Sequence, residues 1–249
     1  MKESGKEKKQ IRQMLLKITA VLFLLSAVIV KYPISAQTST TLYNLNPIDE
    51  KLSGTIVNCM LQDSSGFLWF GSQIGLFRYD GYTLKPYSFN SGASNRFVSN
   101  FITAVCEEDS GIIWIGTFGS GMFKFDPKTG DYLNFNSNDT SKEGLSDNII
   151  RTLCKDDSGR LWIGTQNKGL DCLDPASGKF THYENIAGNV NSISSNTITS
   201  ICKDRAGALW IGTTGGGLNK FDIKTGRFLH FTKTNGEPDS IHNNISTLY

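Results

Sequence analysis

The side chains that could do chemistry are few and scattered in this sequence. Its histidines are His182, His230 and His242, and their spacing fits no metal-binding motif. The run Asp156-Asp157-Ser158-Gly159 could suggest calcium, but it is short and lacks the closing glutamate of a calcium loop. No nucleophile, base and orienting group stand in a recognisable catalytic pattern. The sequence therefore predicts no catalytic residues, no metal site and no cofactor.

The acidic run belongs instead to a unit that recurs along the chain. The stretch GRLWIGTQNKGLDCLD (159–174) has counterparts at 66–80, 111–126 and 207–222, and their tryptophans follow one another at a nearly constant spacing. Each unit offers four short runs with the alternation and β-branched content of strands. A period of about 40–50 residues with four strands is typical of a propeller blade. We therefore expect an all-β β-propeller whose blades are four-stranded and antiparallel.

The connections within a unit have the composition of tight turns. DSSG, EDSG, DDSG and DRAG separate the first two strands, and an acidic side chain there can bond its own backbone while the glycine takes positive φ. This pattern favours hairpin turns over calcium loops. The blades are expected at about 52–91, 97–138, 145–186 and 193–234, with the first strand of a fifth at 241–249 and the ring incomplete in this fragment. Residues 37–249 alone are expected to expose a blade face and to fold poorly.

A tryptophan and a glycine stand at the same place in every unit. A tryptophan ring on a middle strand could form a ligand-stacking platform, but such a ring more often fills the space between blades. The glycine that follows it on the same strand is expected to allow close approach of neighbouring blades. The structural positions are Trp69, Trp114, Trp162, Trp210, Gly71, Gly116, Gly164 and Gly212.

Cysteines also follow the repeat. Cys106, Cys154 and Cys202 occupy one equivalent place in successive units. Equivalent places in stacked sheets lie about 10 Å apart, too far for a disulfide, which needs Cα atoms within about 7 Å. We expect these three to be small buried hydrophobes. Cys172 replaces the basic residue of the other units and is expected to be accessible.

The segment 1–36 differs from the rest. Six basic residues precede an apolar run from Ile18 to Val30, and Ser35-Ala36 offers a small-residue cleavage site. This is typical of a secretory signal peptide, because the run is shorter than the roughly 20 apolar residues that a membrane anchor needs. Without residues 1–36 the chain has 18 basic and 21 acidic residues. That balance argues against nucleic acid as a partner of this region.

The units closely resemble the two-component-regulator propeller repeat. The resemblance depends on the Gly-x-Leu-Trp-Ile-Gly-Thr run, the Gly-Leu pair and the Asp-x-x-Thr-Gly-x-Phe turn. It covers nearly all of 42–249. The first unit departs most, with Phe70-Gly71-Ser72 in place of Ile-Gly-Thr. The resemblance implies the N-terminal periplasmic sensor portion of a hybrid two-component histidine kinase, whose parent is anchored in the inner membrane.

The same resemblance implies a glycan-derived ligand, together with further blades, C-terminal domains and a receptor homodimer as partners. An interaction or dimerisation scaffold without its own small-molecule site is the alternative. A quinone-dependent dehydrogenase propeller is a third interpretation, but that family's tryptophan after the Thr-Gly pair is replaced by Tyr132, Phe180 or Phe228. We expect no catalysis on this chain.

A ligand would bind at the rim where loops meet the central channel. Residues that do not recur are the better candidates, because a site must break the symmetry of the scaffold. The ligand-binding candidates are Phe118, Gln166, Asn167, Lys168, Gln73, Thr214 and Arg96. Asn100, Asn148, Asn196 and Asn244 recur at one place and are expected to be structural caps.

Overall fold

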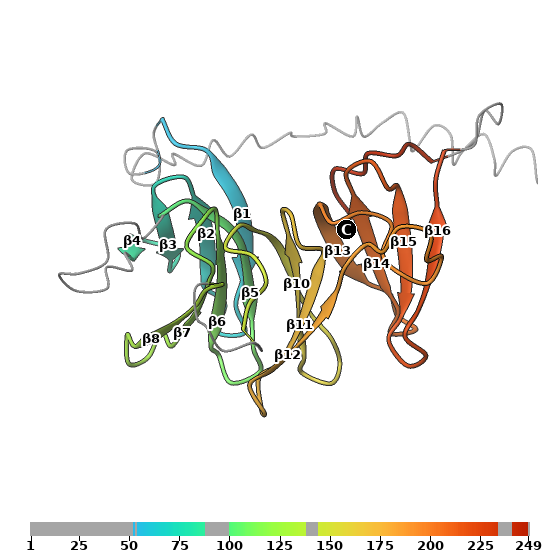
Figure 1. Cartoon of the computed structure of the whole chain (residues 1–249). Coiled ribbons are helices and arrows are strands. Elements are labelled where there is room, and N and C mark those ends of the chain that lie inside the picture. Colours follow the sequence, from blue (N-terminus) through green and yellow to red (C-terminus); the bar gives the residue numbers. More distant parts are fainter. Residues whose placement is uncertain (1–51, 53, 88–99, 138–143, 234–240, 249) are drawn as a thin grey trace, which may run out of the picture. The chain divides into compact units, whose positions relative to one another are not determined.

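The computed structural model describes residues 52, 54–87, 100–137, 144–233 and 241–248, all within one compact unit, Leu45–Tyr249. The secondary-structure elements in these ranges are strands, grouped into four sheets of four (Figure 1). In the same ranges no helix is long and apolar enough to cross a bilayer. The predicted signal peptide lies outside the described residues.

The strands of each sheet follow one another in the chain, and we call each sheet a blade. Blade 1 contains β1 (Val57–Gln62), β2 (Leu68–Ser72), β3 (Gly75–Tyr79) and β4 (Leu84–Tyr87). Blade 2 contains β5 (Ile102–Glu107), β6 (Ile113–Thr117), β7 (Met122–Phe125) and β8 (Tyr132–Phe135). Blade 3 contains β9 (Ile150–Lys155), β10 (Leu161–Thr165), β11 (Leu170–Asp174) and β12 (Lys179–Tyr183). Blade 4 contains β13 (Ile198–Lys203), β14 (Leu209–Thr213), β15 (Leu218–Asp222) and β16 (Arg227–Phe231).

Every blade is an antiparallel meander, as expected from its short turns. In blade 3, Trp162 on β10 pairs with Cys154 on one side and Cys172 on the other. The turn before β10 is closed by a hydrogen bond from Gly159 N to Asp156 O of 3.1 Å, and Gly159 has φ 81°. The four repeated units therefore have the same sheet topology, which confirms the predicted blades.

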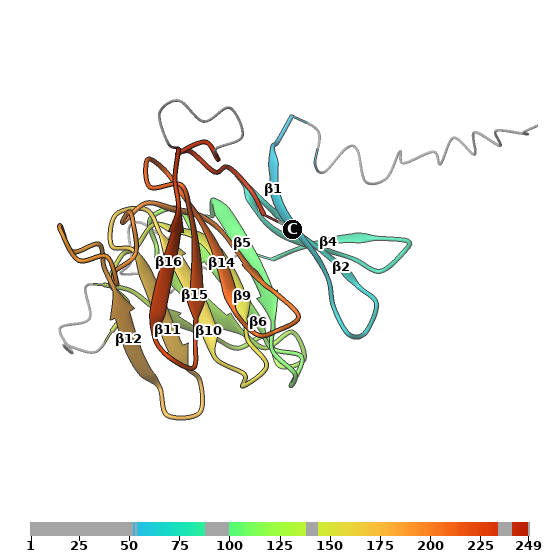
Figure 2. The ribbon, with the colours of Figure 1, turned by 90° about the vertical axis from the view of Figure 1, so that its right-hand side faces the viewer.

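The first strands of the blades, β1, β5, β9 and β13, contact one another in chain order. β1, β5 and β9 can be followed in Figure 2. The glycine after each tryptophan lies at this contact. A Cβ on Gly164 would lie 2.6 Å from Ile198 Cγ2 of the next blade and 2.5 Å from Thr152 Cγ2 of its own. Gly71, Gly116 and Gly212 meet Ile102, Ile150 and Ile245 in the same way. A side chain larger than hydrogen would therefore separate the blades.

The tryptophans fill the space between blades. Trp69, Trp114 and Trp162 are at most 2 % exposed, and Trp210 is half-buried. The Trp162 ring lies 5.5 Å from Phe221 of blade 4, at an interplanar angle of 67°. Edge-to-face contacts of this kind add to the burial of the rings. The rings of blades 1 to 3 are thus core residues, not an exposed stacking platform.

The four blades do not close a ring within the described residues. Val57 is 41 % and Met60 66 % exposed, whereas Ile102, which occupies the place of Val57 in blade 2, is 1 % exposed. The predicted strand of a fifth unit is wrong for the described residues 241–248, which contain none. A strand needs a partner ladder, and this segment instead follows blade 4 through single bonds such as Ile245 N to Thr213 O.

Candidate ligand-binding site

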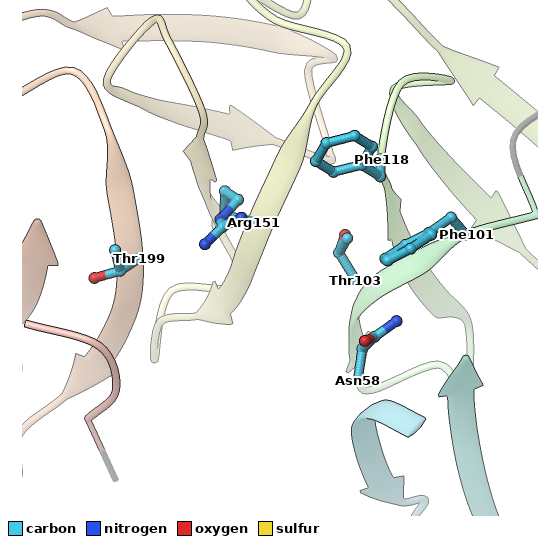
Figure 3. Close-up of a pocket in the computed structure, with 6 residues that line it drawn as sticks. All are labelled: Asn58, Phe101, Thr103, Phe118, Arg151 and Thr199. Atoms are coloured by element: carbon cyan, nitrogen blue, oxygen red, sulfur yellow. The ribbon is translucent and has the colours of Figure 1, made fainter. Parts of the chain in front are cut away.

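A pocket of about 270 Å³ opens on the side of the blades where the first strands lie (Figure 3). Each blade contributes one residue from the same place in its first strand. Two phenylalanines of blade 2 complete the wall, and Figure 3 shows Arg151 between them and Thr199. The lining residues are Asn58, Phe101, Thr103, Phe118, Arg151 and Thr199.

Two of the four strand positions link one blade to the next, and a third links blade 4 to the segment 241–248. The Asn58 amide donates to Ile102 O at 2.8 Å, and the Thr103 hydroxyl donates to Ile150 O at 2.6 Å. The Thr199 hydroxyl donates to Ile245 O in the same way. These bonds satisfy backbone carbonyls of the following unit.

Arg151 differs from its three counterparts. It is exposed, and within the described residues its side chain forms no hydrogen bond or ion pair. A guanidinium is always charged and offers five donors in a planar fork. Arg151 is also the charged residue among the six that line the pocket. The pocket therefore presents an unpaired cation beside neutral polar groups.

Phe118 and Phe101 form the apolar side of the pocket. Their ring centroids are 5.5 Å apart at 44°, and Phe118 is 46 % exposed. The two residues are also joined by the bond from Phe118 N to Phe101 O, and Phe118 forms an isolated bridge to Ile149 of the next unit. The backbone thus holds Phe118 firmly while its ring faces solvent.

Of the predicted ligand residues, only Phe118 lines this pocket among the described part of the chain. Gln73, Gln166 and Thr214 occupy the place of Phe118 in the other blades, where their N–H groups bond Ile56 O, Ile149 O and Thr197 O. Asn167 donates from both its backbone and its amide to Asp147 Oδ2, at 2.9 and 3.1 Å.

Two further candidates remain. Lys168 is exposed, and its backbone N–H bonds Thr165 Oγ1. Arg96 lies outside the described residues.

Two of the recurring asparagines, Asn148 and Asn196, form the predicted backbone caps, and the prediction for Asn244 is wrong. Asn148 Oδ1 accepts from Ser137 N at 2.8 Å, and Asn196 Oδ1 accepts from Asn185 N at 2.7 Å. In the last unit the same bond, from Lys233 N, goes to Asn243 and not to the predicted Asn244. Extending the constant period of the earlier units missed that the connection before Asn243 is slightly shorter.

Sequence reasoning missed five lining residues: Asn58, Phe101, Thr103, Arg151 and Thr199. A signal was present. Thr103, Arg151 and Thr199 occupy the same place in successive units, and the arginine breaks the pattern in a strand that otherwise repeats closely. The predicted residues other than Arg96 follow the second strands, whereas four of the six lining residues lie on first strands.

Blade 3 also contains a buried carboxylate. Asp171 is fully buried, and its Oδ1 lies 2.7 Å from His182 Nδ1. Its Oδ2 accepts from the backbone N and the hydroxyl of Ser146, at 2.9 and 2.8 Å. The bond to Asp171 raises the pKa of His182 above its ordinary value, while partial burial opposes this. In blade 4, Asn219 takes the same place: its Oδ1 accepts from Ser194 N, and its amide donates to the Ser194 hydroxyl.

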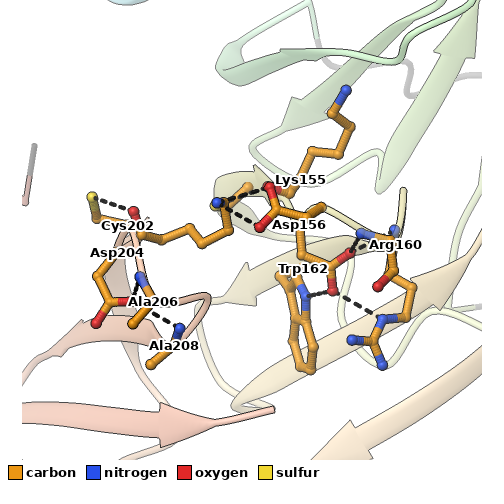
Figure 4. A network of polar contacts seen from close by, with 12 residues as sticks. Lys155, Asp156, Arg160, Trp162, Cys202, Asp204, Ala206 and Ala208 are labelled. Atoms are coloured by element: carbon orange, nitrogen blue, oxygen red, sulfur yellow. Dashed lines mark hydrogen bonds and ion pairs between the residues drawn. The ribbon is translucent and has the colours of Figure 1, made fainter. Parts of the chain in front are cut away.

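In each blade, an acidic residue of the first turn accepts hydrogen bonds from other groups of the protein. Asp156 Oδ1 accepts from the backbone N–H groups of Ser158 and Arg160, which confirms the predicted turn. Its Oδ2 also accepts from the Trp162 indole at 2.9 Å and from Arg160 Nε at 2.9 Å (Figure 4). Asp63, Glu108 and Asp204 accept from Trp69, Trp114 and Trp210 in the same way. A carboxylate in the turn before each tryptophan thus anchors the ring.

The prediction that Cys172 is accessible is wrong, since it is 6 % exposed. In the other blades a basic side chain at this place covers the tryptophan, as Lys124 does at 5.2 Å from the Trp114 ring. In blade 3 the cation comes from Arg160, 5.6 Å from the Trp162 ring, so the short cysteine lies beneath it. Burial raises the pKa of Cys172 to about 12.

Cys106, Cys154 and Cys202 are half-buried, so the prediction of burial holds only in part. Each thiol contacts the carbonyl of the following residue, at 3.7 to 3.9 Å. Burial raises the pKa of Cys154 to about 12. All five cysteines are free thiols.

The architecture is that of a propeller, and its repeat matches a known family. The family model "two component regulator propeller" matches residues 51–73, 96–119, 144–167 and 192–215. The chain therefore carries four copies of the two-component regulator propeller repeat, one for each blade.

Similar proteins agree with this assignment. The extracellular domain of BT3049 of Bacteroides thetaiotaomicron, described as a putative hybrid two-component system, is 27 % identical with a TM-score of 0.62, over 71 % of this chain and 24 % of that one. Histidine kinase P4 of Formosa agariphila is 32 % identical over 97 residues, which are 38 % of this chain and 7 % of that protein.

A virginiamycin B lyase of Staphylococcus aureus, 17 % identical with a TM-score of 0.58 over 76 % of this chain and 59 % of that one, shares the fold alone. The chain thus spans about a quarter of the extracellular domain and a small part of the kinase. The comparisons support an extracytoplasmic signalling propeller.

Proposed function

We propose that this chain is the ligand-sensing propeller region of a hybrid two-component receptor, that it responds to a glycan-derived ligand, and that the ligand binds in the pocket at Arg151. The observation that carries the site is the break in the repeat. Arg151 replaces a residue that bonds the next blade, and it gains no bond within the described residues. A side chain kept without a structural partner is available for a ligand.

The pocket has the two kinds of surface that sugars need. Phe118 offers an exposed ring face to the C–H groups of a sugar ring. Asn58, Thr103 and Thr199 offer amide and hydroxyl groups, and Arg151 adds donors. In this proposal the signal peptide is removed, the parent histidine kinase is anchored in the inner membrane as a homodimer, and this chain itself carries no catalysis.

A glycan array probed with the full-length protein tests this proposal. We expect the protein to bind a defined group of oligosaccharides, and Phe118→Gln, which installs the residue of blade 3, to weaken that binding without loss of folding. Binding of no oligosaccharide would contradict the proposal.

An interaction scaffold is the second candidate function, and exposed apolar residues favour it. Val57 and Met60 lie on a face of blade 1 that corresponds to buried surface in the other blades. Charged substitutions at these two positions that abolish homodimerisation in analytical ultracentrifugation, together with an array that shows no bound glycan, would support the scaffold over the sensor.

A further inference from the structure

We infer that the ligand of this pocket is anionic: an acidic saccharide whose carboxylate or sulfate group pairs with Arg151 while its ring lies against Phe118. This inference rests on the proposed function and specifies the ligand class. It starts from the charge of the pocket, because none of the six lining residues is acidic. A neutral ligand would leave the guanidinium without a counter-charge on covering it, which is costly.

The geometry of arginine suits this role. Its planar fork can donate two parallel hydrogen bonds to the two oxygens of a carboxylate or sulfate group. The other basic residues on the first strands of blades 3 and 4, and Arg160 in the turn before β10, form ion pairs. Lys155 pairs with Asp109, Lys203 with Asp157 and Arg160 with Asp156. Arg151 stands apart from these neighbours, since the described residues offer it no carboxylate.

The volume of the pocket limits the size of the ligand. The pocket volume of about 270 Å³ lies just below the range of typical ligand pockets, which begins at about 300 Å³. The pocket therefore fits one terminal acidic sugar better than a long chain. The phenylalanine pair lies on one side of Arg151 and the Thr199 hydroxyl on the other (Figure 3). A ring that contacts Phe118 can thus present its charged substituent to the guanidinium.

The repeat itself supplies the matched variant. Arg151→Thr installs the residue that blades 2 and 4 carry at the same place, so it removes the charge while keeping a side chain that this fold accepts. Arg205→Thr removes the same charge from an exposed position in the turn between β13 and β14 and serves as control. Arg151→Lys keeps the positive charge and removes the planar guanidinium with its paired donors.

The experiment compares acidic and neutral partners of the same sugars. The full-length protein is applied to an array that holds oligogalacturonates, their methyl esters and sulfated and unsulfated galacto-oligosaccharides. The affinity of each bound pair is then measured by calorimetry. We expect the acidic member to bind about ten- to a hundredfold more tightly, as a charge-assisted bond implies. Arg151→Thr should remove this preference, Arg151→Lys should reduce it, and Arg205→Thr should retain it.

The outcomes separate the inference from the function on which it rests. Preference for oligogalacturonates alone or for sulfated sugars alone would support the inference and identify the charged group. Equal or tighter binding of neutral members, unchanged in Arg151→Thr, would overturn the anionic ligand and leave the sensor intact. Binding of no member of the array would overturn the proposed function and the inference together.

Discussion

A carboxylate beneath each tryptophan is the residue-scale feature that recurs most regularly in this protein. In blade 3, Asp156 is 4 % exposed and accepts four hydrogen bonds, from Ser158 N, Arg160 N, Arg160 Nε and Trp162 Nε1. Each bond satisfies a donor that would otherwise lose its partner on folding. The turn and the ring between the blades are thereby fixed by one side chain.

Asp156→Ala is expected to lower the free energy of unfolding by about 3 kcal/mol, because it leaves a buried indole N–H and turn donors unpaired. Asp157→Ala is the matched control. Asp157 is the next residue and is exposed, and its ion pair with Lys203 contributes about 1 kcal/mol or less. Urea unfolding measures both. Equal losses in the two variants would show that Asp156 does not anchor the ring.

The pair Asp171 and His182 is expected to make the stability of this protein depend on pH. Because Asp171 raises the pKa of His182 above about 6.5, the charged pair contributes most to stability below that pH. Its contribution is lost as the pH rises through the folded-state pKa. Asp171→Asn should keep the fold, since Asn219 holds Ser194 at the same place in blade 4.

Two measurements test this pair. In an NMR titration, the midpoint of His182 should fall in Asp171→Asn. The difference in unfolding free energy between the parent and this variant should shrink as the pH is raised above about 6.5. An unchanged midpoint would show that Asp171 does not stabilise the charged imidazole.

At the scale of elements, the contact between first strands depends on a glycine that allows no side chain. Gly164→Ala is expected to cost about 2 to 3 kcal/mol, because the new methyl group would meet Thr152 Cγ2 at 2.5 Å and Ile198 Cγ2 at 2.6 Å. Thr152→Ser removes the first of these methyl groups. The double variant should therefore lose less stability than the two single variants combined, as a double-mutant cycle would measure. If the stability losses of the two single variants simply add in the double variant, the strain in Gly164→Ala does not come from the contact with Thr152.

The sequence was sufficient for the blades but not for the pocket. Period, turn composition and alternation are local properties, and they predicted the meander of each blade and the hairpin turn at Asp156. The pocket takes one residue from each of the four first strands. No local sequence pattern indicates which of these side chains lacks a hydrogen-bond partner in the folded protein. Cys172 shows the same limit, because its burial depends on Arg160, which approaches the Trp162 ring from a different position than Lys124 does in blade 2.

At the scale of the whole molecule, a side chain on the first strand of blades 1, 2 and 4 donates to the unit that follows, and blade 3 lacks this link. Thr103 bonds Ile150 O and Thr199 bonds Ile245 O, whereas within the described residues no side chain of blade 3 bonds Ile198 O. Under the proposed function, this omission gives up stability in favour of ligand binding. The omission therefore predicts opposite effects of one substitution on folding and on binding.

Arg151→Thr should restore the missing bond and raise the unfolding free energy by about 1 kcal/mol, the usual contribution of one hydrogen bond. Thr103→Val, which removes an existing bond of this kind, should lower it by a similar amount. Urea unfolding of the full-length protein measures stability, and calorimetry on the saccharides selected by the array measures binding. A variant that gains stability while losing the acidic ligand would mark Arg151 as a residue retained for binding. Loss of stability in Arg151→Thr would mean instead that the arginine stabilises the blades. It would contradict the prediction that Arg151 lowers stability while it enables binding.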